Sequence, residues 1–146
     1  SEVNENNASA VAGEMLGAME VSPDQEFIKI VEEGLRQLPD YIALGQSPLA
    51  DRLGIQADSH IGRGRELQRV LTESIELLRP AEKRPPEPLP RVWYNHAVLH
   101  DAYVEGVPNR EIIARLYISE GTFNRTRRNA IRGLARSLME MYPITQ

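Results

Sequence analysis

Arginine is concentrated near the carboxyl end of this 146-residue chain, in a segment that also carries threonine and asparagine. Five arginines lie within a stretch of twelve residues: Arg125, Arg127, Arg128, Arg132 and Arg136. A guanidinium group can make paired hydrogen bonds to phosphate or guanine, and an asparagine amide can do the same with adenine. These residue types and their spacing predict contacts to nucleic acid rather than catalysis.

The charge of the chain is divided unevenly along its length. The whole chain has a net charge of −4. Residues 91–146 carry eight arginines, no lysine and five acidic residues, for a net charge of +3, whereas residues 1–90 have a net charge of −7. Such asymmetry between halves is typical of proteins that contact nucleic acid with one half only.

Several other kinds of chemistry are disfavoured. The chain has no cysteine, which excludes disulfides and cysteine-based metal sites. His96 and His100 are spaced to share a helix face with Asp101 beside them, but no third ligand is evident, so we expect no metal site and no cofactor. The segment 62–65, GRGR, lacks the Gly-Lys-Ser/Thr ending of a phosphate-binding loop. We therefore expect that the protein is not an enzyme.

The sequence carries neither a membrane-span pattern nor a secretion-signal pattern. No apolar run approaches the length of a membrane span. The amino-terminal residues are acidic where a secretion signal would be basic. We expect a cytoplasmic protein that does not contact a membrane.

The positioning elements are predicted to be helices, because no segment shows sustained period-two alternation. Ser22 and Pro23 predict a helix start with Ser22 as the cap, and Ser47 and Pro48 predict another. A short helix is expected at residues 40–45, and a longer one at residues 63–79. The expected fold class is all-α.

Five prolines between residues 80 and 90 predict an extended linker, since neither a helix nor a central strand tolerates that density. We place a domain boundary there. The predicted organisation is a flexible tail or weak helix at 1–22, a helical oligomerisation or regulatory domain at 23–79, the linker at 80–90, and a DNA-binding domain of three or four helices at 91–146.

The second domain is predicted in more detail. One helix is expected over residues 91–105, with Val92 and Trp93 on its apolar face and Gly106 after it. Asn109 is expected to cap the next helix, and Ser119 the last one, which runs to about Met141. The turn between them, SEGT, makes a helix-turn-helix layout with a basic second helix.

On a helical wheel, the last helix divides into two faces. The expected core face holds Phe123, Ala130, Ile131, Leu134, Leu138 and Met141. The opposite face holds Thr122, Arg125, Thr126, Asn129, Arg132, Gly133 and Arg136, without an acid. Arg127 lies among the apolar positions, so we expect its head to pair with Asp101, Glu105 or Glu111.

The run GVPNREIIARLYISEGTFNRTRRNAIRGL resembles the LuxR-type DNA-binding domain, and is similar to region 4 of extracytoplasmic-function sigma factors. The resemblance covers residues 91–138, and LYISEGT is its most specific part. It implies a recognition helix in the major groove, with groove-facing or phosphate-facing positions at Thr122, Asn124, Arg125, Thr126, Arg128 and Asn129. Two departures concern base preference: Arg127 replaces an apolar residue, and Asn124 replaces a basic one.

These patterns predict a sequence-specific transcriptional regulator that binds double-stranded DNA as a homodimer. The predicted DNA-binding residues are Ser119, Thr122, Asn124, Arg125, Thr126, Arg128, Asn129, Arg132 and Arg136. The alternative is a protein-interaction module that keeps the helix-turn-helix fold and engages a partner through residues 23–79. A further alternative is a second, degenerate helix-turn-helix in residues 46–70, where SPLADRLGI precedes Arg63, Arg65 and Arg69.

Overall fold

The computed structural model describes residues 22–143, and these form seven α-helices without a strand among them. This confirms the all-α prediction. The helices are α2 (Gln25–Arg36), α3 (Tyr41–Gly45), α4 (Pro48–Arg52), α5 (His60–Glu76), α6 (Tyr94–Leu99), α7 (Asn109–Leu116) and α8 (Glu120–Met141). No helix in this part of the chain is both long and apolar enough to cross a membrane. The tail or weak helix expected at residues 1–22 lies, except for Ser22, outside the described residues.

Helix starts follow from local capping, although one predicted cap is wrong. Ser47 caps α4 by accepting a hydrogen bond from the Leu49 amide, and Pro48 takes the first helical position as predicted. The cap of α2 is Asp24 and not Ser22: the Asp24 carboxylate accepts from the Phe27 amide at 2.8 Å. A carboxylate there also complements the helix dipole, which favours Asp24 over the earlier serine.

The long helix of the first half starts and ends earlier than residues 63–79. Its cap is Ser59, whose Oγ accepts from the Gly62 amide at 3.0 Å, and the helix ends at Glu76. The two glycines at 62 and 64 weakened the sequence signal for a helix. Gly64 is required by packing, because a Cβ there would overlap the carbonyl oxygen of Tyr41 in α3. The backbones of α3 and α5 therefore approach closely at this point.

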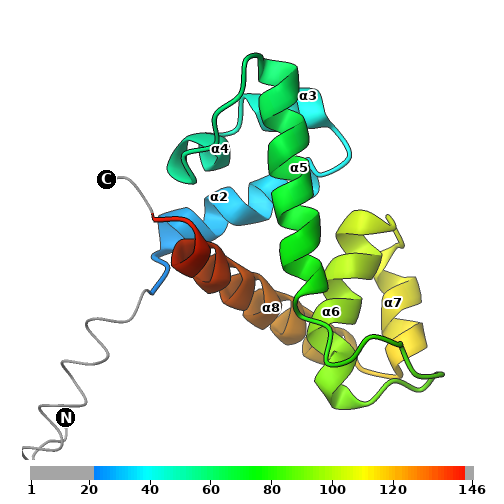
Figure 1. The fold of residues 1–146 in the computed structure, drawn as a ribbon. Helices are drawn as coiled ribbons and strands as arrows, with labels where there is room; N and C mark the ends of the chain where they lie inside the picture. Colours follow the sequence, from blue (N-terminus) through cyan, green and yellow to red (C-terminus); the bar gives the residue numbers. More distant parts are fainter. Residues whose placement is uncertain (1–21, 144–146) are drawn as a thin grey trace, which may run out of the picture.

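Two clusters of buried apolar side chains form the core. The larger one joins α2, α3, α4 and α5 with the carboxyl-terminal part of α8, whose Leu134 and Leu138 are fully buried. The smaller one joins Trp93, α6, α7 and the first turn of α8, with Phe123 at its centre. Figure 1 shows α8 running from the α6–α7 group to α2. Helix α8 thus contributes to both clusters, and α6 does so as well, since Leu99 belongs to the larger cluster and Val98 to the smaller one.

The proline-rich segment 80–90 contains neither helix nor strand, and its role as a linker between domains stays a prediction. The segment nevertheless packs against the helices. Leu89 is buried in the smaller cluster, and Arg84 hydrogen-bonds to Asp101. The division of the chain into two domains at this segment stays a prediction, since α8 packs against residues on both sides of it.

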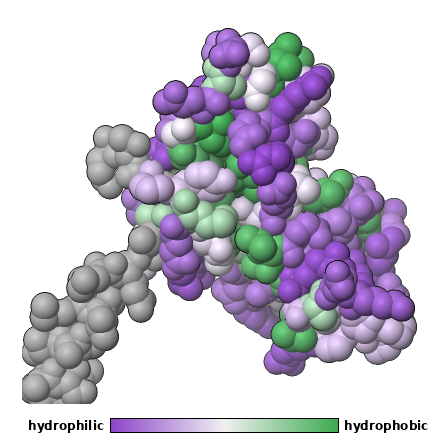
Figure 2. Space-filling view, in the orientation of Figure 1, coloured by the Kyte–Doolittle hydropathy of each residue, from purple (hydrophilic) through white to green (hydrophobic). Residues whose placement is uncertain are grey.

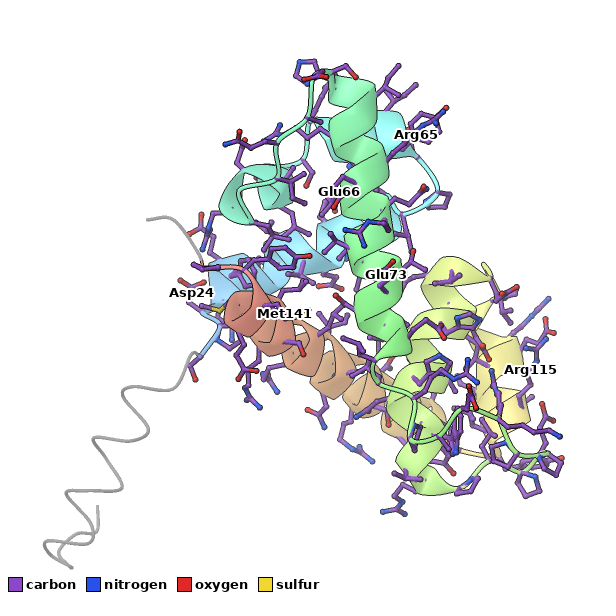
Figure 3. All side chains as sticks on the ribbon, viewed as in Figure 1. Asp24, Arg65, Glu66, Glu73, Arg115 and Met141 are labelled. Carbon is purple, nitrogen blue, oxygen red and sulfur yellow. The ribbon has the colours of Figure 1, made fainter. Side chains whose placement is uncertain are left out.

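The surface is mainly polar on the face seen in Figure 2, where apolar side chains form small separate patches. Figure 3 shows Asp24 at the start of α2 and Met141 at the end of α8 near one another. Met141 was predicted to lie on the core face of α8, which is wrong: 45% of it is exposed. Met139 and Tyr142 pack against the larger cluster at this last turn, whereas Met141 is not part of it.

Candidate nucleic-acid interface

The candidate interface is built around the turn between α7 and α8. Tyr117 follows α7 in the left-handed conformation, with φ 57° and ψ 45°, and lets the chain reverse within three residues. Ser119 then caps α8 as predicted, its Oγ accepting from the Thr122 amide at 3.1 Å. The predicted cap of α7 is wrong: Pro108 occupies that position without a side-chain bond, and Asn109 is the first helical residue.

The expected single helix at 91–105 is divided into three parts. A 3₁₀ turn (Arg91–Trp93) precedes α6, and a π-helical turn (His100–Val104) follows it. The 3₁₀ turn rotates Val92 away from the core, so that 67% of it is exposed, contrary to the predicted apolar face. Trp93 is buried as predicted. Gly106 comes shortly after the π-helical turn and has a φ of 71°.

Five of the predicted DNA-binding residues line one groove along the first turns of α8. They are Ser119, Thr122, Arg125, Thr126 and Asn129. The groove has a volume of about 720 Å³, and its other wall comes from Arg91, Tyr94 and Asn95. Sequence reasoning missed these three residues. The excess of arginine after residue 90 was their only signal, because a wheel of α8 alone cannot show which helix lies beside it.

The other four predicted residues lie outside the groove. Asn124 is half-buried, while Arg128, Arg132 and Arg136 are exposed on α8. Within residues 22–143, none of Arg125, Arg128, Arg132 and Arg136 forms an ion pair.

Two of the arginines are held by uncharged neighbours on α8. Arg125 donates to Thr122 Oγ1 at 3.1 Å, and Arg132 donates to Asn129 Oδ1 at 3.3 Å. Because these contacts join residues three positions apart, they align the guanidinium groups along the helix without neutralising them.

Arg127 is partly buried as predicted, but its acidic partner is different. It contacts the Tyr103 hydroxyl at 3.5 Å and Glu32 Oε2 at 3.8 Å. The acids predicted from nearby sequence have other partners: Asp101 binds Arg84, Glu105 lies against His100, and Glu111 binds Arg115. Glu32 lies on α2, far from Arg127 in sequence, and the two residues meet only because α2 packs against α8.

The arginines of α5 have intramolecular partners. Arg63 donates to the carbonyl oxygens of Gly45 and Ile55, and Arg65 stacks over the ring of Tyr41. Arg69 binds Glu66 and Glu73 on the same helix. Figure 3 shows Arg65, Glu66 and Glu73 along α5. The geometry therefore adds no support to the second, degenerate helix-turn-helix considered for residues 46–70.

The charges on α5 differ in character from those on α8. The hydrogen bond from Arg69 lowers the pKa of Glu66, and the hydrogen bonds to Glu66 and Glu73 raise the pKa of Arg69. Both signs thus alternate along α5, as on an ordinary solvated helix. Between Thr122 and Arg136, arginine is the only charged residue type on the open face of α8, and the exposed Glu140 follows on the same face near the end of the helix.

Comparison of the chain with models of protein families, with curated proteins and with solved structures found no match. The resemblance to the LuxR-type domain stays a prediction, and the function has to be argued from the residues and their geometry.

Proposed function

We propose that residues 91–138 form a helix-turn-helix domain that binds double-stranded DNA, with α8 in the major groove, and that the protein is a sequence-specific transcriptional regulator. The observation that carries the proposal is the groove beside α8, where Arg125, Thr126 and Asn129 lie next to Arg91 with no carboxylate among the lining residues. Such a surface, with positive charge and hydrogen-bond donors, is complementary to DNA phosphates and to the acceptors on base edges.

The first three turns of α8 have the dimensions and chemistry for base contacts. Thr122, Arg125, Thr126 and Asn129 recur at intervals of three and four, so they share one face. An α-helix about 10–12 Å across fits a major groove about 12 Å wide. Arg125 and Asn129 are the types that form paired hydrogen bonds with guanine and adenine edges.

The remaining arginines are suited to the DNA backbone. Arg136 lies two turns beyond Asn129, a rise of about 10 Å along α8. At that distance a side chain would leave the floor of the groove and approach a phosphate strand. We assign Arg132 and Arg136 to such contacts, and Arg128 to the opposite edge.

The acidic first half does not cover this face within the described residues. Glu33 pairs with Arg36 and Glu73 with Arg69, while Glu32 reaches only Arg127 on α8, which lies away from the groove. The proposed interface is therefore open within the described residues. We further propose that the protein acts as a homodimer on half-sites about one helical turn of DNA apart.

The test uses the full chain. Selection from random double-stranded DNA gives a target, and its affinity is then measured at several salt concentrations for the wild type and for Arg125→Ala/Arg128→Ala. A matched control, Arg36→Ala/Arg69→Ala, removes the same charge from the first half. We expect weaker binding and a shallower salt dependence, by about one unit per lost phosphate contact, in the first variant only. Equal affinity of the two variants would refute the interface.

A second candidate function is supported by the outer side of α2. Glu26, Glu32 and Glu33 line a groove of about 470 Å³ there, together with Lys29, Ile30, Arg36 and Pro48. Arg36 pairs with Glu32 and Glu33, and a basic segment of a protein partner would have to compete with it for these carboxylates. If random-sequence selection enriches no DNA for the wild type, and a basic peptide library yields ligands that Glu33→Gln loses, the protein-interaction function is the better one.

A further inference from the structure

Two histidines and a glutamate converge where the end of α5 meets α6. Glu76 is the last residue of α5, and His96 and His100 are one turn apart at α6 and the following π-helical turn. Glu76 Oε2 lies 3.2 Å from His96 Nε2 and 3.3 Å from His100 Nδ1. Each residue offers one ligand atom, and the three atoms lie within 4.8 Å of one another.

We propose that Glu76, His96 and His100 bind a divalent transition-metal ion of the Zn²⁺ class, through Oε2, Nε2 and Nδ1. Imidazole nitrogen and carboxylate oxygen are ordinary ligands for Zn²⁺, and two histidines with one glutamate form a known type of three-ligand set. Asp101, which sequence analysis placed beside the histidines, takes no part because it binds Arg84.

The spacing of the atoms agrees with a tetrahedral site. Ligand bonds of about 2.0–2.1 Å in tetrahedral geometry place neighbouring donor atoms about 3.3 Å apart. The two distances from Glu76 Oε2 have this value. The two histidine nitrogens lie within 4.8 Å of each other, so they would need to approach by at most about 1.5 Å to reach the same spacing. Glu76 and His100 are partly exposed, at 36% and 22%, although the ligand atom Nδ1 of His100 is itself buried.

The surrounding contacts are those that hold metal ligands in place. Arg79 donates to Glu76 Oε1 at 3.1 Å, which leaves Oε2 for the histidines. Glu105 Oε2 lies 3.2 Å from His100 Nε2, the nitrogen that faces away from the site. A ligating histidine usually donates its second N–H to such a carboxylate, which fixes the ring and its tautomer.

Hydrogen bonding alone leaves the cluster incomplete. His96 Nε2 pairs with Glu76, but His100 Nδ1 is a buried atom without a hydrogen-bond partner, although it lies close to the same oxygen. Buried polar atoms normally have a partner. A metal ion would satisfy His96 Nε2, His100 Nδ1 and Glu76 Oε2 at once, whereas His96 Nδ1, which is also buried without a hydrogen-bond partner, would stay so.

The consequence is a link between the two halves of the chain. Glu76 precedes the proline-rich segment, and both histidines follow it. An ion bound by all three would fasten α5 to α6. It would bind the folded state only, and so would stabilise it by RT ln(1 + c/Kd), where c is the ion concentration; the unfolding temperature would rise with the logarithm of the ion concentration once that concentration exceeds Kd.

The experiment measures metal binding by the full chain after treatment with a chelator. Zn²⁺ is titrated calorimetrically, and Co²⁺ is used as a probe whose visible absorption reports tetrahedral coordination. The variants are Glu76→Gln and His100→Gln, each changing one partly exposed ligand. His60→Gln is the matched control, because His60 is the third histidine of the chain and lies exposed at the start of α5.

We expect one ion per chain, a Zn²⁺-dependent rise in unfolding temperature, and the Co²⁺ spectrum in the wild type and His60→Gln. Glu76→Gln and His100→Gln should weaken binding by more than 10-fold. Glu105→Gln, which keeps all three ligands, should weaken it by about 10-fold. Absence of binding by the wild type, or equal affinity in His100→Gln and His60→Gln, would overturn the site. Circular dichroism shows whether each variant is folded, and Glu105→Gln keeps the test decisive if another variant is not.

Discussion

Asp101 accepts two parallel hydrogen bonds from Arg84, each 3.2 Å long, although its side chain is only 3% exposed. Arg115 Nη1 lies 3.7 Å from Oδ2 of the same carboxylate. A buried carboxylate is stable only when its charge is compensated, and a forked guanidinium does this well. The pair therefore fastens the proline-rich segment to the helices that carry the candidate interface.

The first prediction compares the two arginines. Arg84→Ala leaves the Asp101 charge buried with a distant partner, so we expect a loss of about 3 kcal/mol in the free energy of unfolding. Arg115→Ala removes a longer and more exposed contact, and we expect a loss of about 1 kcal/mol or less. Urea unfolding followed by circular dichroism measures both. Losses of equal size would show that the paired hydrogen bonds are not what stabilises Asp101.

The second prediction concerns two helical glycines in different surroundings. Gly64→Ala places a methyl group against the Tyr41 carbonyl, so we expect α3 and α5 to separate at a cost of about 3 kcal/mol or more. Gly133→Ala has open space around it on α8, and should stabilise the protein by about 0.5–1 kcal/mol through helix propensity. Thermal unfolding of both variants gives the sign directly. A stabilising Gly64→Ala would contradict the close crossing.

The helices were largely predictable because their signals are local. Ser47 with Pro48, and Ser119 before the last helix, are caps that act within three residues, and both are confirmed. Ser22 and Asn109 failed as caps because a neighbouring residue took the position. Local competition of this kind is decided by fractions of a kcal/mol, which a residue type alone does not reveal.

The pairing of distant elements was not predictable from the same signals. Helical periodicity shows that one face of α8 is buried, but it does not show that α2 covers it, and so Glu32 was not foreseen as the partner of Arg127. Glu76 was missed for the same reason. It lies 20 residues from His96 in sequence, beyond the proline-rich segment, and only the packing of α5 against α6 brings them together.

The third prediction concerns acid. The pKa of His96 is lower in the folded protein than its ordinary value of 6.5, so the unfolded chain binds the proton first as the pH falls. Stability that is complete above pH 6.5 is then lost below it, with a slope of at most about 1.4 kcal/mol per pH unit. Glu76, whose pKa is lowered from 4.5, adds a second loss at more acidic pH.

The measurement is the free energy of unfolding in urea between pH 4 and pH 8, with a chelator present. His96→Gln should abolish the first loss whatever its own stability, because the slope and not the absolute value reports the proton. His60→Gln should keep the wild-type slope, since its side chain is exposed. A slope near pH 6 that survives in His96→Gln would assign it to another group.

The last prediction rests on the proposed function and separates base contacts from phosphate contacts on one helix. Asn129 lies in the groove and is oriented by Arg132, whereas Arg136 lies outside it. With a selected DNA target, Asn129→Ala should lose about 1–3 kcal/mol of discrimination at a single base pair and keep the wild-type salt dependence. Arg136→Ala should weaken binding to all sequences evenly and lower the salt slope by about one. Binding to single-base variants of the target at two salt concentrations measures both effects. If both variants change only the salt slope, the residues of the protein groove contact the DNA backbone alone. The DNA sequence must then be recognised by other residues.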